Sequence, residues 1–90
     1  MKDIEEYELF LKTEKKLGDN TIESYLLDLM SFLKWFNGDV RTTTKEDILN
    51  YISFLRENLN EKSINRHISS LKSFYLYLLD MNYIKINPLE

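Results

Sequence analysis

The side chains best suited to chemistry gather in the last third of the chain. From Lys62 to Leu79 there is no acidic residue, and the segment combines cations with several serines. Ammonium and guanidinium groups bind phosphate oxygens, and Lys or Arg can also hydrogen-bond guanine. Small hydroxyl side chains let a helix backbone approach DNA closely and can hydrogen-bond phosphates or base edges. The composition of this segment therefore favours contact with a nucleic acid.

Helical periodicity divides the segment into two faces. The apolar positions, spaced four, three, four and three residues apart, are Ile64, Ile68, Leu71, Tyr75 and Leu78. At about 100° per residue, this core stripe centres on Ile64. The opposite face is predicted to hold Lys62, Arg66, Ser69, Ser70, Ser73 and Tyr77. A plain solvated face is the alternative, but such faces usually mix Glu with Lys in i,i+4 pairs. We therefore predict a helix face turned toward a DNA groove.

A second candidate contact is Thr21, in the first turn of a predicted helix. Backbone N–H groups at a helix N-terminus, together with a hydroxyl, can bind a phosphate. On physical grounds Thr21 is equally well explained as a residue that starts a helix. The outer side of the same helix carries Leu27 and Trp35, which are predicted to be exposed. With the acidic first helix, they support an alternative function as a protein–protein interaction module.

The sequence gives little support for a catalytic site or a metal-binding site. The chain has no Cys and a single His, His67, so it lacks a thiolate nucleophile and a Cys- or His-rich metal site. No nucleophile–His–acid set or Gly-rich phosphate loop is visible, and we expect no catalytic residue, metal or cofactor. His67 lies beside the predicted core stripe and is interpreted as a structural histidine. Four tyrosines at core spacing are predicted to pack in the interior: Tyr7, Tyr25, Tyr51 and Tyr75.

Four helices must position these residues. A chain of 90 residues with 43% hydrophobic residues, two Gly and one Pro is expected to form one all-α domain. The predicted helices span about residues 3–17, 20–36, 43–58 and 61 to about 81. Gly18 is expected to end the first helix. Capping boxes are predicted at Asn20 with Glu23 and at Thr43 with Glu46. The tail from Asn82 contains an Asn-Pro pair and is predicted to be a linker. Neither a signal peptide nor a membrane span is visible.

Four segments of the sequence resemble a known family. Residues 20–25, followed by Asp28-Leu29 and Phe32-Leu33, are similar to the second helix of the N-terminal core-binding, or SAM-like, domain of tyrosine recombinases. These enzymes include phage integrases and Xer-type recombinases. Residues 43–55 resemble the third helix of that domain, and residues 62–75 resemble its fourth. Asn87-Pro88 matches the pair that precedes the catalytic domain. The resemblance covers nearly the whole chain, in the same order and spacing.

The resemblance implies a four-helix SAM-like bundle that forms one half of a clamp around duplex DNA. Residues 1–84 would be the DNA-binding domain, and residues 85–90 would begin a linker to a separate catalytic domain that cuts DNA through a tyrosine. The implied DNA contacts are Thr21, Ser24, Lys62, Ser63, Arg66, Ser69 and Ser73. The sequence departs from the family at Leu26 and Leu27, where basic residues are common, so the second helix lacks its usual phosphate cation.

The implied partners are a recombination core site in double-stranded DNA and other recombinase protomers assembled on it. The isolated domain is expected to be monomeric, away from membranes, and located in the bacterial cytoplasm at the nucleoid. The net charge of −3 opposes tight binding to DNA, although residues 60–90 hold four basic and three acidic side chains. We therefore expect weak, salt-sensitive binding that is strengthened by a tethered catalytic domain.

Overall fold

The described residues, 2–90, fold as four α-helices with one short 3-10 helix. A computed structural model describes the backbone of residues 2–90 and the side chains from residue 4 onward. Met1 and the side chains of Lys2 and Asp3, where the first helix was expected to begin, lie outside the described residues. The helices are α1 (Lys2–Thr13), α2 (Asp19–Phe36), η1 (Val40–Thr42), α3 (Lys45–Arg56) and α4 (Glu61–Asp80). The described part contains no strand, so the all-α prediction is confirmed.

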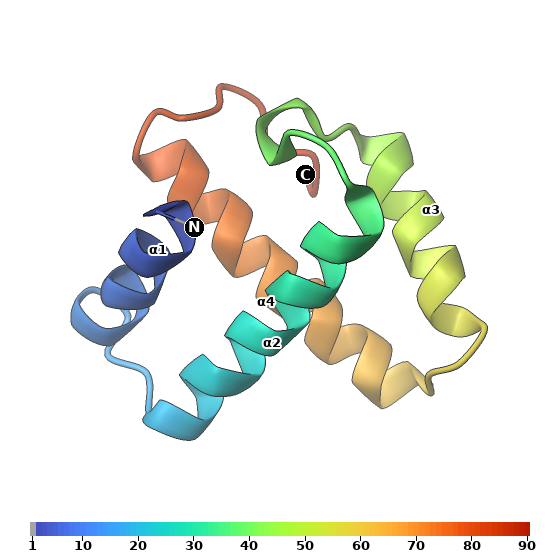
Figure 1. The fold of residues 1–90 in the computed structure, drawn as a ribbon, viewed down its shortest axis with the longest axis horizontal. Helices are drawn as coiled ribbons and strands as arrows, with labels where there is room; N and C mark the ends of the chain where they lie inside the picture. The colour runs from blue at the N-terminus through green and yellow to red at the C-terminus, as the bar shows by residue number, and fades with distance from the viewer. Residues whose placement is uncertain (1) are drawn as a thin grey trace.

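Helix α4 is the central element of the bundle. Helix α2 crosses in front of it, with α1 at one side and α3 at the other (Figure 1). Of all helix pairs, α2 and α4 have the most extensive contact, and α1 and α3 each pack against both. Helix α4 is therefore enclosed from several directions, and only a narrow sector of it can reach solvent.

Two aromatic clusters hold the helices together. Between α1 and α4, the rings of Tyr7 and Phe74 meet edge to face, with centroids 5.2 Å apart. Between α2 and α3, Phe32 and Tyr51 make the same kind of contact at 5.0 Å. Tilted and edge-to-face pairs of this kind stabilise a core beyond the area that they bury. Burial raises the pKa of Tyr7, Tyr51 and Tyr75 to about 12. The predicted packing role of these three tyrosines is confirmed, and Tyr25 is half-buried against the same core.

The first two helix boundaries differ from the sequence prediction. Helix α1 ends at Thr13, and Lys16 rather than Gly18 takes the left-handed conformation, with φ 54°. Gly18 is instead the residue before α2, with φ −71° and no side-chain cap. The predicted Asn20–Glu23 capping box is therefore wrong, because α2 begins one residue before Asn20 and includes it.

The capping box of α3 lies one residue later than predicted. Thr44 Oγ1 accepts a hydrogen bond from the Asp47 backbone N–H at 3.2 Å, and the Asp47 carboxylate accepts from the Thr44 N–H at 2.9 Å. The Thr43–Glu46 box is wrong because Thr43 has another partner, the buried Tyr75 hydroxyl at 2.8 Å. The same tyrosine hydroxyl lies 2.9 Å from the Val40 carbonyl oxygen, which fixes η1 against α4.

The tail packs back onto the bundle. Helix α4 ends at Asp80, as the predicted non-helical tail requires, and residues 84–90 lie beside η1 (Figure 1). Ile84, Asn87 and Pro88 are buried, and the Arg41 guanidinium lies 4.7 Å from the ring centre of Tyr83. No helix of residues 2–90 has both the length and the apolar character that a membrane crossing requires.

Candidate nucleic-acid interface

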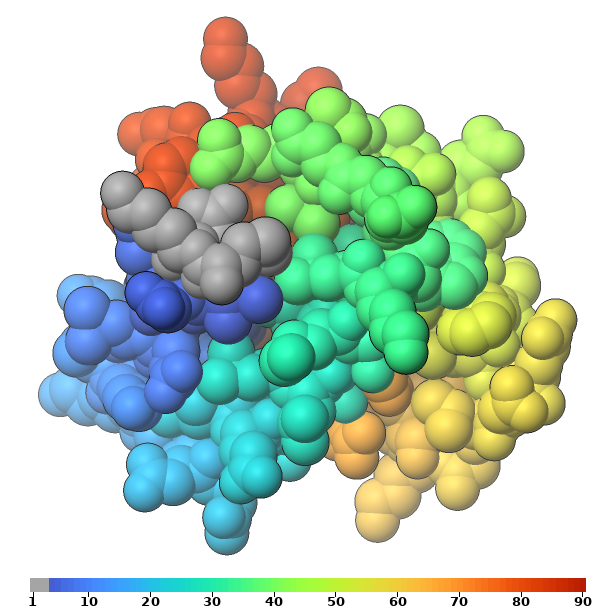
Figure 2. Space-filling model, viewed as in Figure 1, coloured from blue at the N-terminus to red at the C-terminus, as the bar shows by residue number. Residues whose placement is uncertain are grey.

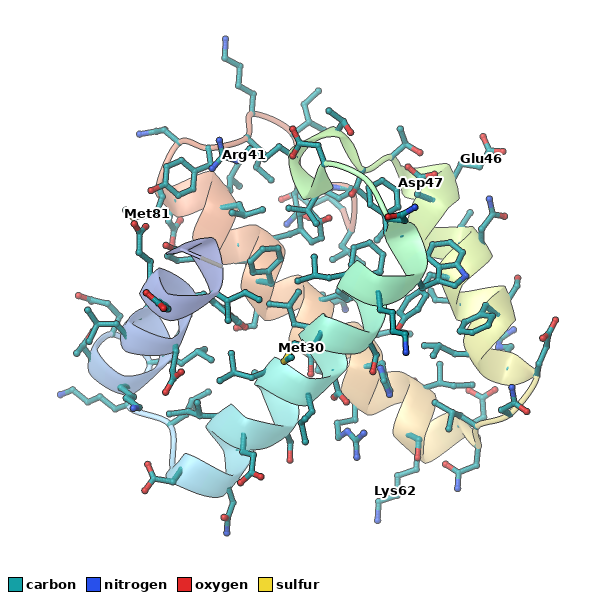
Figure 3. The ribbon with its side chains drawn as sticks, in the orientation of Figure 1. Met30, Arg41, Glu46, Asp47, Lys62 and Met81 are labelled. Atoms are coloured by element: carbon teal, nitrogen blue, oxygen red, sulfur yellow. The ribbon has the colours of Figure 1, made fainter. Side chains whose placement is uncertain are left out.

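Between the two ends of α4, its exposed residues form one continuous stripe, which we call the α4 stripe. It consists of Lys62, Asn65, Arg66, Ser69, Lys72 and Leu76, and the exposed acids Glu61 and Asp80 lie beyond it at the first and last positions of the helix. The N-terminal part of α4 emerges from beneath α2 at the lower edge of the molecule (Figure 2), and Lys62 points away from the bundle there (Figure 3). None of the side chains in the stripe is acidic, so the stripe has the charge and polarity expected of a surface that meets phosphates.

The predicted outward face requires a correction, because two of its members lie inside the protein. Ser70 is fully buried and Tyr77 is 2% exposed, whereas Ile68, assigned to the core stripe, is only half-buried. The buried sector centres near His67, about 60° from Ile64 on the helical wheel. The prediction failed because helix α1 covers one flank of α4 around Tyr77 and α2 covers the flank around Ser70.

The structure brings most of the predicted α4 contacts to the surface. Lys62, Arg66 and Ser69 are exposed, and Ser73 is half-buried at the border of the stripe. Ser63 is half-buried, and its backbone N–H donates to the Asn60 side chain at 2.9 Å, which caps the helix. These positions lie along one side of one helix and can face a single groove together.

The predicted contacts on α2 are less favourable. Thr21 is exposed and Ser24 is half-buried. Asp19 and Glu23 are exposed in the same first turns, and they border a groove between α1 and α2 that also contains Glu8. Carboxylates repel phosphates, so this end of α2 is less suited than the α4 stripe to meet a nucleic acid.

A buried carboxylate joins α2 to the α4 stripe. Asp28 is 3% exposed, and its two oxygens lie 2.9 Å from Nε and Nη2 of Arg66 in a bidentate ion pair. The Ser70 hydroxyl donates to the same carboxylate at 2.9 Å. His67 Nε2 lies 3.4 Å from Asp28 Oδ1. We call these four residues the Asp28 cluster.

The charges in the Asp28 cluster act on one another. The hydrogen bond to Asp28 raises the pKa of Arg66 above its ordinary value. Burial lowers the pKa of His67; the Asp28 charge opposes this shift and the Arg66 charge adds to it. His67 Nδ1 is buried and has no hydrogen-bond partner within the described residues. The structural interpretation of His67 is thus supported, because the side chain is buried and contributes to the packing of α4 on α2.

Sequence reasoning missed Asp28 as a functional candidate. It entered only as part of the run that resembles the family, and its partner Arg66 lies 38 residues away. A signal was present, since Asp28 is the only charged residue in the apolar stretch from Leu26 to Met30. Charged residues are rarely buried unless they are paired, so a lone acid in an apolar stretch indicates a cationic partner elsewhere in the fold.

The exposure predicted for two residues on the outer side of α2 is confirmed for Leu27 only. Leu27 is 58% exposed, and Met30, one turn later on α2, is 54% exposed. The exposure predicted for Trp35 is wrong, because Trp35 is half-buried and its ring centre lies 5.1 Å from that of Tyr51. No group of His, Cys, Asp or Glu suited to hold a metal ion occurs in the part of the chain that the structure describes.

Comparison with known proteins identifies the domain. Residues 4–82 match the family model of the phage integrase N-terminal SAM-like domain. The chain is 38% identical over its full length to tyrosine recombinase XerC of Lacticaseibacillus casei, of which it covers 32%. It is 36% identical over 99% of its length to tyrosine recombinase XerD of Rickettsia bellii, of which it covers 30%. The TnP I resolvase of Bacillus thuringiensis is 40% identical over 82% of the chain.

The chain thus spans about a third of the length of these curated relatives. No solved structure matches it. The match covers α2, α3, α4 and all but the first two residues of α1, and it includes the α4 stripe and the Asp28 cluster. The chain therefore belongs to the family of phage integrase N-terminal SAM-like domains.

Proposed function

We propose that this domain binds duplex DNA as the non-catalytic, N-terminal half of the clamp of a tyrosine recombinase and thereby acts in DNA recombination. The α4 stripe enters the major groove, and Lys62, Arg66 and Lys72 contact phosphates or guanine. Ser69 hydrogen-bonds the DNA at the same face, with Ser63 and Ser73 at its borders. Thr21 and Ser24 add a weaker contact from α2. In this role the DNA substrate would hold the protein at the nucleoid.

The observation that carries the proposal is the absence of acidic side chains from the α4 stripe in a protein of net charge −3. An arbitrary surface of an acidic protein mixes carboxylates with cations. Here the cations and a serine occupy the exposed stripe, while Asp28, the carboxylate beneath it, is buried and paired with Arg66. The exposed acids of α4, Glu61 and Asp80, lie only at the two ends of the helix, and Glu61 is 3.7 Å from Arg56. The arrangement presents hydrogen-bond donors and positive charge outward, which suits a phosphate-lined groove.

The domain alone should bind weakly. Two or three cationic contacts predict that the logarithm of the association constant falls with the logarithm of salt concentration at a slope between about −2 and −3. A catalytic domain tethered to it would raise the local concentration of DNA and convert this weak contact into a useful one. The bidentate geometry of Arg66 and the capped start of α4 fix the donors before DNA arrives, which lowers the entropic cost of binding.

Fluorescence anisotropy with a short labelled duplex tests the proposal. Lys62→Ala and Lys72→Ala should each weaken binding and reduce the magnitude of the salt slope by about 0.9. Lys45→Ala is the matched control, because it removes the same charge from an exposed site at the start of α3. Its neighbours Glu46 and Asp47 lie at the upper right of Figure 3, whereas Lys62 lies at the bottom, so this site is well separated from the start of α4. Equal losses in all three variants would show that only net charge matters.

A second role, contact between protomers assembled on DNA, is favoured by the exposed Leu27 and Met30. Adjacent apolar side chains one turn apart on a helix can seat in a groove of a neighbouring protein. Leu27→Asp should then reduce the cooperativity of binding to a duplex long enough for two copies, while leaving affinity for a single-copy duplex unchanged. An equal loss on both duplexes would argue against the protomer contact.

A further inference from the structure

The guanidinium of Arg66 is hydrogen-bonded to Asp28 along the edge that faces the protein, and its other side is exposed to solvent. Nε and Nη2 bond the two carboxylate oxygens at 2.9 Å each, while the Arg66 side chain is 53% exposed. Among the described residues the guanidinium bonds only to Asp28. An arginine has five N–H donors in a rigid plane, and this pairing uses the edge made by Nε and Nη2. The edge made by Nη1 and the outer N–H of Nη2 is left available for another pair of acceptors.

Asp28 itself is firmly fixed. The Ser70 hydroxyl lies 2.9 Å from Asp28 Oδ2, and His67 Nε2 lies 3.4 Å from Oδ1. The carboxylate sits where α2 and α4 cross, in the most extensive helix contact of the fold. The plane of the Arg66 guanidinium is therefore set by a buried group of a different helix, and its direction does not depend on the flexible side chain alone.

We propose that Asp28 is a positioning residue for DNA binding, which holds one edge of Arg66 so that the other edge points at paired acceptors of the DNA. Such acceptors are two phosphate oxygens or O6 and N7 of guanine. The inference rests on the proposed function, because it assigns a role within that DNA contact. Asp28 does not touch DNA and acts only through Arg66.

The pairing has a second consequence for the charge of the surface. Asp28 and Arg66 together are neutral, so Arg66 contributes directed hydrogen bonds and little net charge. Counterion release then comes from Lys62 and Lys72 alone, and the slope for the wild type should lie near −1.8, at about 0.9 per phosphate contact. A freely exposed arginine would add its own charge and give a slope near −2.7.

Salt titrations of variants separate these effects. Asp28→Asn keeps the shape of the side chain and removes its charge, so the slope should steepen by about 0.9. The association constant extrapolated to molar salt, which reports directed contacts, should fall about tenfold as the guanidinium loses its fixed orientation. Arg66→Lys keeps the positive charge but loses the planar, two-pronged set of donors. The salt-dependence slope should therefore stay constant, while the association constant extrapolated to molar salt should fall. Glu46→Gln is the control, because it also neutralises one carboxylate but at an exposed site on α3, away from the α4 stripe and the Asp28 cluster, so the extrapolated constant should not fall.

A measurement on the wild type does not depend on the folding of any variant. In a nitrogen–proton NMR spectrum, the Arg66 Nε–H signal should be protected from exchange and should keep its position when duplex is added, since Asp28 holds it throughout. The Nη signals should shift instead. An Arg66 Nε–H signal that moves and exchanges freely in the complex would overturn the positioning role.

The two proposals fail in different ways. If the wild type binds with a dependence on Lys62 and Lys72, but Asp28→Asn matches it in slope and in extrapolated affinity, the positioning role of Asp28 is wrong and the DNA-binding function stands. If the wild type shows no salt-dependent binding to duplex at low ionic strength, the proposed function is wrong, and the role of Asp28 is lost with it.

Discussion

Removing Arg66 should destabilise the fold even though much of its side chain is exposed. Arg66→Ala leaves the Asp28 carboxylate, 3% exposed, without the two 2.9 Å hydrogen bonds that offset its burial. Breaking a fully buried ion pair costs about 3–5 kcal/mol. Because Arg66 is 53% exposed, water can partly replace it, and we discount this to roughly 2 kcal/mol. For a domain of this size, that loss lowers the melting temperature by about 10 °C.

Thermal and urea denaturation followed by circular dichroism would measure this loss. Lys72→Ala on the same stripe is the control, and a surface change of this kind should stay within about 0.5 kcal/mol. Adding Asp28→Asn to Arg66→Ala removes the uncompensated charge and should restore part of the stability. An Arg66→Ala protein as stable as the Lys72→Ala protein would refute the reasoning, because the buried carboxylate would then not need its partner.

Three further predictions concern the rest of the fold. Asp47→Ala should cost about 1 kcal/mol more in urea denaturation than Glu46→Ala, because both acids lie in the first turn of α3 but only Asp47 completes the capping box; equal costs would contradict the observed box. Tyr75→Phe should cost about 1–2 kcal/mol, since the buried Val40 carbonyl and the Thr43 hydroxyl lose their partner; unchanged stability would show that these contacts contribute little. Because burial lowers the pKa of His67, the proton binds more tightly to the unfolded chain, so the free energy of unfolding should decrease as pH falls below about 6.5. His67→Gln should flatten that decline in urea titrations, and an unchanged pH profile would exclude His67 as its source.

The helices and their interior faces were largely predictable because they depend on local spacing. Of the five apolar positions predicted for the core stripe of α4, the structure buries Ile64, Leu71, Tyr75 and Leu78. Helix boundaries were less accurate, because neighbouring threonines offer equivalent caps. Thr43 and Thr44 are both residue types that cap helices. Thr44 caps α3 because the Thr43 hydroxyl accepts a hydrogen bond from Tyr75, which lies more than 30 residues away in the sequence.

The candidate site was predicted only in part, since its correct orientation depends on contacts between helices. The helical wheel of α4 was drawn from four aliphatic residues and Tyr75, and it placed the centre of the buried face at Ile64. The buried Phe74 and Ser70, which shift that centre, could be assigned only once α1 and α2 were seen to flank the helix. The pairing of Asp28 with Arg66 likewise exists because α2 crosses α4 at that point. A helical wheel contains no information about that crossing.

The placement of the α4 stripe against DNA is tested most directly by NMR titration of the nitrogen-15-labelled domain with duplex at low ionic strength. The amide signals of Lys62 to Ser73, together with Thr21, should shift as duplex is added and return toward their free positions when salt is raised. Shifts confined to α3, or shifts that are insensitive to salt, would contradict the account.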